Sequence, residues 1–308
     1  MTAQISTPDV APAWSPERRS EMRSHHVLNR DGLSLHARSA GTEGLPLVLL
    51  HGYGLSSCIW EGVVELLGPD RRCVALDFRG HGDSQWDAER RYDRDDLAAD
   101  VIEMLDALHI DQCVLMGHSL GGDVAARVAL RFPERVVALG LVDIGPELRA
   151  PGLRRVRELT FRTPDSYDSP AEYRAWLQAL NPFAQASELT TLARHTLDKR
   201  ADGTYQQKLD PAFRSALWDD MEPEDAATHE ARWAMLRAIS QPKLVLRGAI
   251  SALLGRATAA RMAEVLTRTT LEVIPRAGHA LMLDNPTVTA AAIGRFLENL
   301  ENLAAEAA

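Results

Sequence analysis

The sequence has no long apolar run. No stretch reaches the roughly 18 consecutive apolar residues of a membrane-spanning helix, and residues 1–20 have no apolar core of the kind found in secretory signals. Basic residues are in deficit, since 34 Lys and Arg stand against 43 Asp and Glu and give a net charge of −9. Nucleic-acid binding depends on clustered Lys and Arg. We therefore expect neither a membrane anchor nor a nucleic-acid partner.

Cysteine is also scarce. The three cysteines, Cys58, Cys73 and Cys113, are an odd number and lie in or beside apolar segments. This arrangement favours packed free thiols in a reducing compartment over a disulfide framework, so a cytoplasmic location is expected. The sequence contains no H-E-x-x-H pattern and no Cys/His quartet. We therefore expect no metal and no other cofactor.

Short apolar runs alternate with helix-like segments over the first half of the chain. This alternation predicts an α/β fold with a mostly parallel central sheet flanked by helices. An antiparallel hairpin is expected at the start, where the turn dipeptide Asp31-Gly32 separates residues 27–29 from 33–37. Further strands are predicted at 45–50, 73–77, 113–116, 136–142, 243–247 and 271–274, and helices at about 57–68, 94–109, 120–132 and 287–302.

The pattern changes between residues 146 and 238, which lack strand-like runs and are rich in Arg, Glu, Asp and Ala. This segment is predicted to be a mostly helical cap. It interrupts one domain, because strands on both sides of it are needed to complete the sheet. The predicted organisation is an N-terminal extension at 1–24, a core domain at 25–145 and 239–308, and a cap at 146–238.

Residues 117–122, with the sequence GHSLGG, form the most informative motif because they follow an apolar run and open a helix-like segment. A serine hydroxyl is a poor nucleophile at neutral pH. A sharp strand-turn-helix, known as a nucleophile elbow, holds such a hydroxyl where a base can reach it. Glycines at 117 and 121 suit a turn that brings backbone segments close together. The motif predicts Ser119 as a nucleophile.

Three further motifs accompany the elbow: HGYG at 51–54, DFRGHGDS at 77–84 and the late Gly278-His279. With them the sequence resembles the α/β-hydrolase superfamily over residues 25–145 and 240–300. The resemblance implies a serine hydrolase with a helical cap domain.

Roles for individual residues follow from this resemblance and from the chemistry of acyl transfer. Members of the superfamily carry the catalytic base in the loop after the last strand, here strand 271–274. The resemblance therefore implies His279 as the base, and histidine is the usual base near neutral pH. A tetrahedral intermediate needs two backbone N–H groups near its oxyanion. Leu120, the residue after the nucleophile, is expected to supply one, and the resemblance implies Tyr53 for the other.

The acid that orients the histidine is left open by the sequence. Related hydrolases usually carry it in the loop after strand 243–247, often at the position of Ala252, and alanine cannot orient an imidazole. Either the acid has moved to Asp143, at the end of the preceding core strand, as in superfamily lactonases that open the zearalenone ring, or the chain lacks it. Glu147 or another carboxylate is the remaining alternative. Asp284, before Asn285-Pro286, is expected at a helix start.

The leading functional hypothesis is a serine hydrolase that cleaves a carboxylic ester or lactone of a mostly apolar small molecule through an acyl-enzyme. Ser119 would attack, His279 would move the proton and Asp143 would orient His279. One alternative is a hydrolase that cleaves a carbon–carbon bond in a ring-cleavage product, since such enzymes share the elbow, the histidine and the helical lid. Another is a hydrolase-fold binding protein with an incomplete triad, suggested by Ala252.

Overall fold

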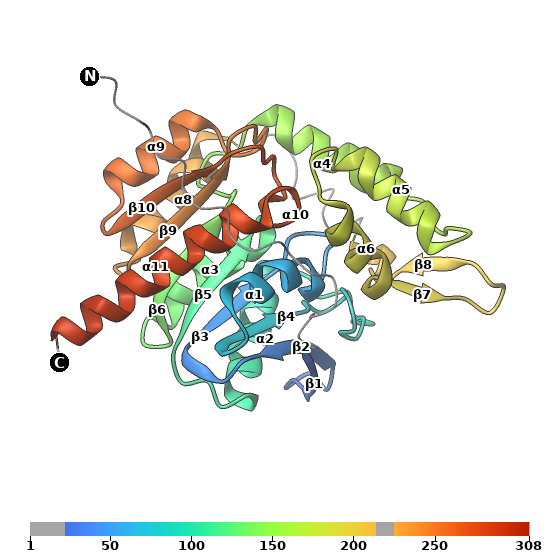
Figure 1. Ribbon diagram of the computed structural model, residues 1–308, viewed down its shortest axis with the longest axis horizontal. Coiled ribbons are helices and arrows are strands. Elements are labelled where there is room, and N and C mark those ends of the chain that lie inside the picture. The colour runs from blue at the N-terminus through green and yellow to red at the C-terminus, as the bar shows by residue number, and fades with distance from the viewer. Residues whose placement is uncertain (1–21, 214–224, 308) are drawn as a thin grey trace, which may run out of the picture.

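The computed structural model describes residues 22–213 and 225–307. Among these residues, eight strands form one sheet in the order β1-β2-β4-β3-β5-β6-β9-β10 (Figure 1). Strand β2 runs antiparallel to β1 and β4, and the other neighbours pair in parallel. The strands are β1 (Arg23–Leu28), β2 (Ser34–Ala40), β3 (Glu43–Leu50), β4 (Arg71–Leu76), β5 (Cys113–His118), β6 (Val136–Val142), β9 (Lys243–Gly248) and β10 (Thr269–Ile274). The expected fold class is confirmed.

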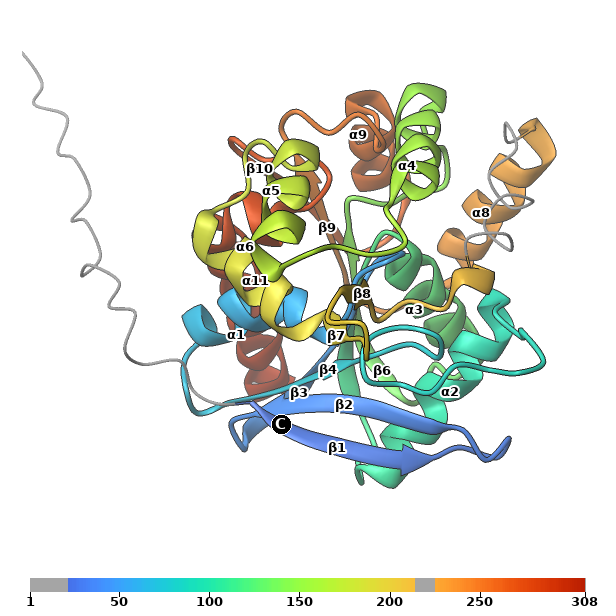
Figure 2. The same ribbon diagram turned by 90° about the vertical axis from the view of Figure 1, so that its right-hand side faces the viewer.

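Helices cover both faces of this sheet (Figures 1 and 2). On one face α1 (Glu61–Leu67), preceded by the 3-10 turn η1 (Ser57–Trp60), packs against α11 (Pro286–Ala307). On the other face α2 (Arg94–Ala107) packs beside α3 (Leu120–Arg131). No helix in the described part of the chain combines the length and the apolar character of a membrane span.

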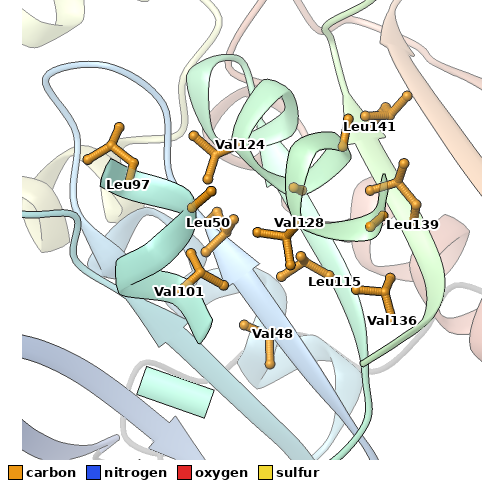
Figure 3. Packing of buried hydrophobic residues seen from close by; sticks show 14 of the residues in the cluster. Val48, Leu50, Leu97, Val101, Leu115, Val124, Val128, Val136, Leu139 and Leu141 are labelled. Carbon is orange, nitrogen blue, oxygen red and sulfur yellow. The ribbon is translucent and has the colours of Figure 1, made fainter. Parts of the chain in front are cut away.

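The core between the sheet and the helices α2 and α3 contains many valine and leucine side chains (Figure 3). Val124 and Val128 lie one helical turn apart on α3 and are fully buried against strands β3, β5 and β6. On β5, Leu115 belongs to this cluster, whereas its neighbours Val114 and Met116 belong to the cluster on the opposite face. Both faces of β5 are therefore covered, which explains why the strand reads as a continuous apolar run.

Between β6 and β9 the chain forms four described helices: α4 (Ala150–Arg162), α5 (Pro170–Leu180), α6 (Ala186–His195) and α8 (Ala226–Ala238). It also forms a short antiparallel hairpin of β7 (Leu197–Lys199) and β8 (Tyr205–Gln207). The expectation of a segment without strands is wrong at this hairpin. Three-residue strands are too short to show a period of two, and a register can be set by the turn alone, here around Gly203 with its φ of +90°.

Two helices of the core were not predicted from the sequence. They are α9 (Arg256–Val265), between β9 and β10, and the four-residue α10 (Leu281–Asp284), directly before α11.

All three cysteines are buried and form no disulfide, as expected. Burial raises the pKa of each thiol, in every case to about 12. They are packing residues of the sheet and of η1.

Candidate active site

Ser119 lies between the end of β5 and the start of α3, in a backbone conformation that side chains rarely adopt. Its φ is +53° and its ψ is −119°. A Cβ atom on Gly117 would lie 2.0 Å from the carbonyl oxygen of Gly121, and one on Gly121 would lie 2.5 Å from that of His51. Only glycine therefore fits on either side of the turn. The Ser119 N–H donates to the carbonyl of Val142 at 3.1 Å, which ties the turn to the end of β6.

His279 and Asp143 meet at the same edge of the sheet. The Nδ1 atom of His279 lies 2.8 Å from Oδ2 of Asp143, a carboxylate that is fully buried. The same carboxylate accepts hydrogen bonds from the backbone N–H of Gly248 at 3.1 Å and from the hydroxyl of Ser251 at 2.6 Å. With Nδ1–H donating to Asp143, the Nε2 atom of His279 is left to accept a proton.

The loop after β9 contacts this pair through Ser251 and not through Ala252. Ala252 is an exposed residue on the wall of a large cavity. The Ser251 hydroxyl binds Asp143 and also accepts the N–H groups of Leu253 and Leu254 at 3.1 and 3.2 Å. Sequence reasoning missed Ser251, because a serine in a loop carries no signal of what it contacts.

The alternative carboxylate, Glu147, has other partners. Its Oε1 atom accepts from Trp233 Nε1 at 2.6 Å and from Arg261 at 3.0 Å. These contacts join the segment after β6 to α8 and α9, and they favour a structural role for Glu147.

The loop at 51–54 follows β3 and lies directly against the elbow. A Cβ atom on Gly52 would lie 2.6 Å from His118 Nδ1 and 3.2 Å from Ser119 Cβ, so glycine permits this approach. Tyr53 from this loop and Leu120 from the first turn of α3 both line a small cavity beside Ser119. The N–H of Leu120, as the first residue of a helix, has no intrahelical partner.

Two buried histidines support this loop. His51 accepts the N–H of Phe78 on Nε2 at 3.0 Å, and His81 accepts the N–H of Gly54 on Nε2 at 3.2 Å. Their Nδ1 atoms donate to backbone carbonyls at 2.7 and 3.2 Å. Burial lowers the pKa of both, and the nearby His51 helps to lower that of His81 to about 3. Both rings are therefore neutral acceptors that hold the loop in place.

The backbone around His279 is fixed from two sides. His118 Nε2 donates to the carbonyl of His279 at 2.9 Å, and burial lowers the pKa of His118 well below its ordinary value. On the other side, Oδ2 of Asp284 accepts the N–H of Gly278 at 2.7 Å. The prediction that Asp284 starts a helix is wrong. It ends α10, and Asn285 accepts the N–H of Val288 at 3.3 Å in the first turn of α11.

Two cavities open beside Ser119. The larger, of about 390 Å³, includes His279 and side chains of α5 and α6 such as Trp176 and Leu192. The smaller, of about 90 Å³, includes Leu120 and residues of α8. Both cavities therefore lie between the carboxyl ends of the sheet strands and the segment inserted after β6, as is common for ligand sites in α/β proteins.

One described cluster has the residue types of a metal site. His36, Asp77 and Asp83 can bring three ligand atoms within 4.8 Å of one another. The two nitrogens of His36 are already bonded to Asp77 at 2.7 Å and to Ser24 at 3.1 Å. Asp77 also accepts the N–H groups of Ser57 and Asp83. These hydrogen bonds account for the cluster as a structural part of the loop at 77–84.

Comparison with known proteins identifies the family. The chain is 28% identical to the 2-hydroxymuconate semialdehyde hydrolase of Pseudomonas sp. (strain CF600), over 93% of this chain and 96% of that protein. It is 31% identical to the pimeloyl-[acyl-carrier protein] methyl ester esterase of Nitrosomonas europaea, over 82% of this chain and 95% of that protein. The crystal structure of an alpha/beta hydrolase from Novosphingobium aromaticivorans matches with a TM-score of 0.78 and 28% identity, covering 90% of this chain and 98% of that one. The model of the alpha/beta hydrolase fold matches residues 46–286. The chain belongs to the alpha/beta hydrolase fold family.

Proposed function

We propose that the protein is a serine hydrolase that cleaves a carboxylic ester of a mostly apolar small molecule through an acyl-enzyme. The observation that carries this proposal is the 2.8 Å contact between His279 Nδ1 and the buried Asp143, at a cavity that Ser119 also lines. A nucleophile, a base and an orienting carboxylate are the three parts that such a reaction needs.

In the proposed first half-reaction, Ser119 Oγ forms a bond to the carbonyl carbon and its proton passes to His279 Nε2. Asp143 stabilises the imidazolium that results. The N–H groups of Leu120 and Tyr53 hold the oxyanion, and loss of one such donor typically costs about 3 kcal/mol of transition-state stabilisation. The bond from carbon to the leaving oxygen then breaks, and that oxygen takes the proton from His279.

In the second half-reaction, water replaces the alcohol. His279 removes a proton from the water, which attacks the acyl carbon, and Ser119 leaves with that proton restored to its oxygen. The products are one alcohol and one carboxylic acid.

Carbon–carbon bond hydrolysis of a ring-cleavage product is the second candidate. It is favoured by the similarity to a 2-hydroxymuconate semialdehyde hydrolase along 93% of the chain. Arg155, Asn181 and Gln207 on the large cavity are polar groups suited to the carboxylate and enol of such a substrate. The third hypothesis, a binding protein without a complete triad, depended on a missing acid, and the contact of Asp143 with His279 favours a hydrolase instead.

The test compares the protein with its Ser119→Ala variant on p-nitrophenyl acetate and butyrate, together with labelling by a fluorophosphonate. We expect kcat to fall by about 10³-fold or more and labelling to disappear. Ser187→Ala, which removes a hydroxyl on α6 bonded to Glu188, is the matched control and should retain both. Turnover of a 2-hydroxy-6-oxo-dienoate without turnover of any ester would favour the second candidate. Hydrolysis and labelling that persist in Ser119→Ala would contradict both.

A further inference from the structure

The two cavities beside Ser119 meet at the nucleophile but extend in different directions. Tyr53, Ser119, Val156 and Leu253 line both of them. From this shared wall the small cavity continues along α3 toward α8, and the large cavity continues under α5 and α6. A substrate attacked at Ser119 therefore has two separate spaces for the two groups attached to its carbonyl carbon.

The proposed chemistry decides which group enters which space. In an ester, the carbonyl carbon carries the oxygen that becomes the oxyanion, the acyl group and the leaving alkoxide. The leaving oxygen must receive its proton from His279, so it has to depart on the His279 side. His279 and its neighbours Gly278 and Ala280 line the large cavity. They are not among the described residues on the wall of the small cavity.

The side chains that line the two cavities also differ. The small cavity, about 90 Å³, is lined mostly by apolar side chains, which on α3 and α8 include Ala126, Met235 and Leu236. Its charged lining residues are Arg232 and the ion pair of Arg94 with Asp123. The large cavity, about 390 Å³, combines the aromatic ring of Trp176 with the polar side chains of Asn181 and Gln207.

The large cavity also has apolar groups at exposed positions. Phe183 and Ile250 line it and are 53% and 50% exposed, respectively. Large apolar side chains exposed beside a cavity are suited to contact with a bound group that reaches outward from it.

We propose that the small cavity receives the acyl group and the large cavity the leaving group. The preferred substrates would be esters that join a short apolar acid to a larger, partly aromatic alcohol with polar substituents. This inference rests on the proposed function, and it selects an ester of two unequal parts over a small lactone ring, whose two parts cannot separate into two cavities.

The experiment measures kcat/KM for two ester series, p-nitrophenyl esters from acetate to octanoate and acetates of alcohols from ethanol to naphthol. Met235, half-buried on α8, is the residue to vary in the small cavity. Met235→Phe narrows the cavity and should lower the octanoate-to-acetate ratio of kcat/KM by about tenfold or more. The reason is that one methylene group in an apolar pocket already changes the ratio of kcat/KM between two substrates by about tenfold. Met235→Ala widens it and should raise the same ratio.

Phe183→Ala is the matched variant in the large cavity. It should lower the naphthyl-to-ethyl ratio in the alcohol series more than it changes the ratio in the acyl series. Thermal unfolding of each variant checks that it is folded, and the opposite signs expected for the two Met235 variants separate a filled cavity from general damage.

The outcomes distinguish this inference from the proposed function. If Ser119-dependent hydrolysis is present but acyl selectivity follows Phe183 and alcohol selectivity follows Met235, the assignment of the cavities is reversed and the inference fails. It also fails if neither ratio responds to Met235, while the proposed function stands. Absence of Ser119-dependent hydrolysis for every ester overturns both.

Discussion

At the scale of single residues, the acid partner of His279 is the position that the sequence left undecided. Asp143 directly follows β6 and the loop with Ser251 follows β9, and these two strands are neighbours in the sheet. Either loop can deliver a carboxylate to the same imidazole, so spacing along the chain does not separate the two arrangements. The structure brings Asp143 to His279 and leaves Ala252 exposed on the cavity wall.

Replacing this acid should reduce turnover far more than binding. We expect Asp143→Asn to lower kcat by about 10⁴-fold with a much smaller change in KM, because the amide can no longer hold the imidazole in the productive tautomer. Ala252→Asp should change kcat little, since the Nδ1 atom of His279 is already bonded to Asp143. Steady-state kinetics on p-nitrophenyl butyrate measures both.

The exchange of acid and hydroxyl gives a stricter version of this test. Asp143→Ser combined with Ser251→Asp exchanges two side chains whose oxygen atoms lie 2.6 Å apart in the unchanged protein. We expect its kcat to exceed that of Asp143→Ser alone. A large gain from Ala252→Asp in the otherwise unchanged protein would contradict the role of Asp143.

At the scale of elements, the hairpin of β7 and β8 joins the inserted segment to the loops of the core. Gln207 Nε2 donates to the carbonyl of Gly54 at 2.7 Å. The N–H of Gly82 donates to the carbonyl of Lys208 at 2.9 Å. The hairpin and the residue directly after it therefore contact both the loop that contains Tyr53 and the loop that supports it through His81.

Loss of the Gln207 contact should loosen the loop at 51–54. We expect Gln207→Leu to lower fluorophosphonate labelling rates and kcat/KM for acetate esters about fivefold, the equivalent of one hydrogen bond of about 1 kcal/mol. Gln206→Leu is the matched control, because the Gln206 amide bonds Arg200 on the exposed side of the hairpin. A loss seen only with bulky alcohols would indicate a wall contact instead of loop positioning.

The elements that the sequence predicted well are those with strong local signals. Val136–Val142 is buried along nearly its whole length, and its apolar run gives the strand bounds directly. The helix after Ser119 follows from an amphipathic pattern. The hairpin of β7 and β8 and the four-residue α10 carry no such period, and long-range contacts such as Gln207 with Gly54 define them. Which elbow and loop form the site was predictable from motifs, whereas Ser251 and Asp284 were found only from their contacts.

At the scale of the whole molecule, buried groups with shifted pKa values make stability depend on pH. His81 has a folded-state pKa of about 3 against an ordinary value of 6.5. The unfolded chain therefore binds a proton in this window that the folded chain does not, and stability falls as the pH falls from 6.5 toward 3. Asp77 contributes at lower pH. Burial works to raise its pKa, but hydrogen bonds from His36 and from the N–H of Ser57 bring it to about 2. Its contribution is lost between about pH 3.8 and 2.

Replacing His81 should weaken the pH dependence of the free energy of unfolding. We expect the free energy of unfolding of His81→Gln to fall less steeply between pH 6.5 and 4.5 than that of the parent protein, by up to about 1.4 kcal/mol per pH unit. Urea unfolding at a series of pH values measures the slope. His109→Asn, at an exposed position with a φ of +52° that asparagine tolerates, should keep the parent slope, and equal slopes for all three proteins would contradict the prediction.

The backbone conformation of Ser119 and Asp143 makes activity depend on the order of the central sheet. Both residues have positive φ, +53° and +51°, at the ends of adjacent strands. Such conformations cost about 1–3 kcal/mol each and persist only where the surrounding structure imposes them. A chain whose helices persist while its central sheet loosens would relax at both points. Catalytic competence should then disappear before helical content does, so a loss of turnover would report that the sheet has loosened.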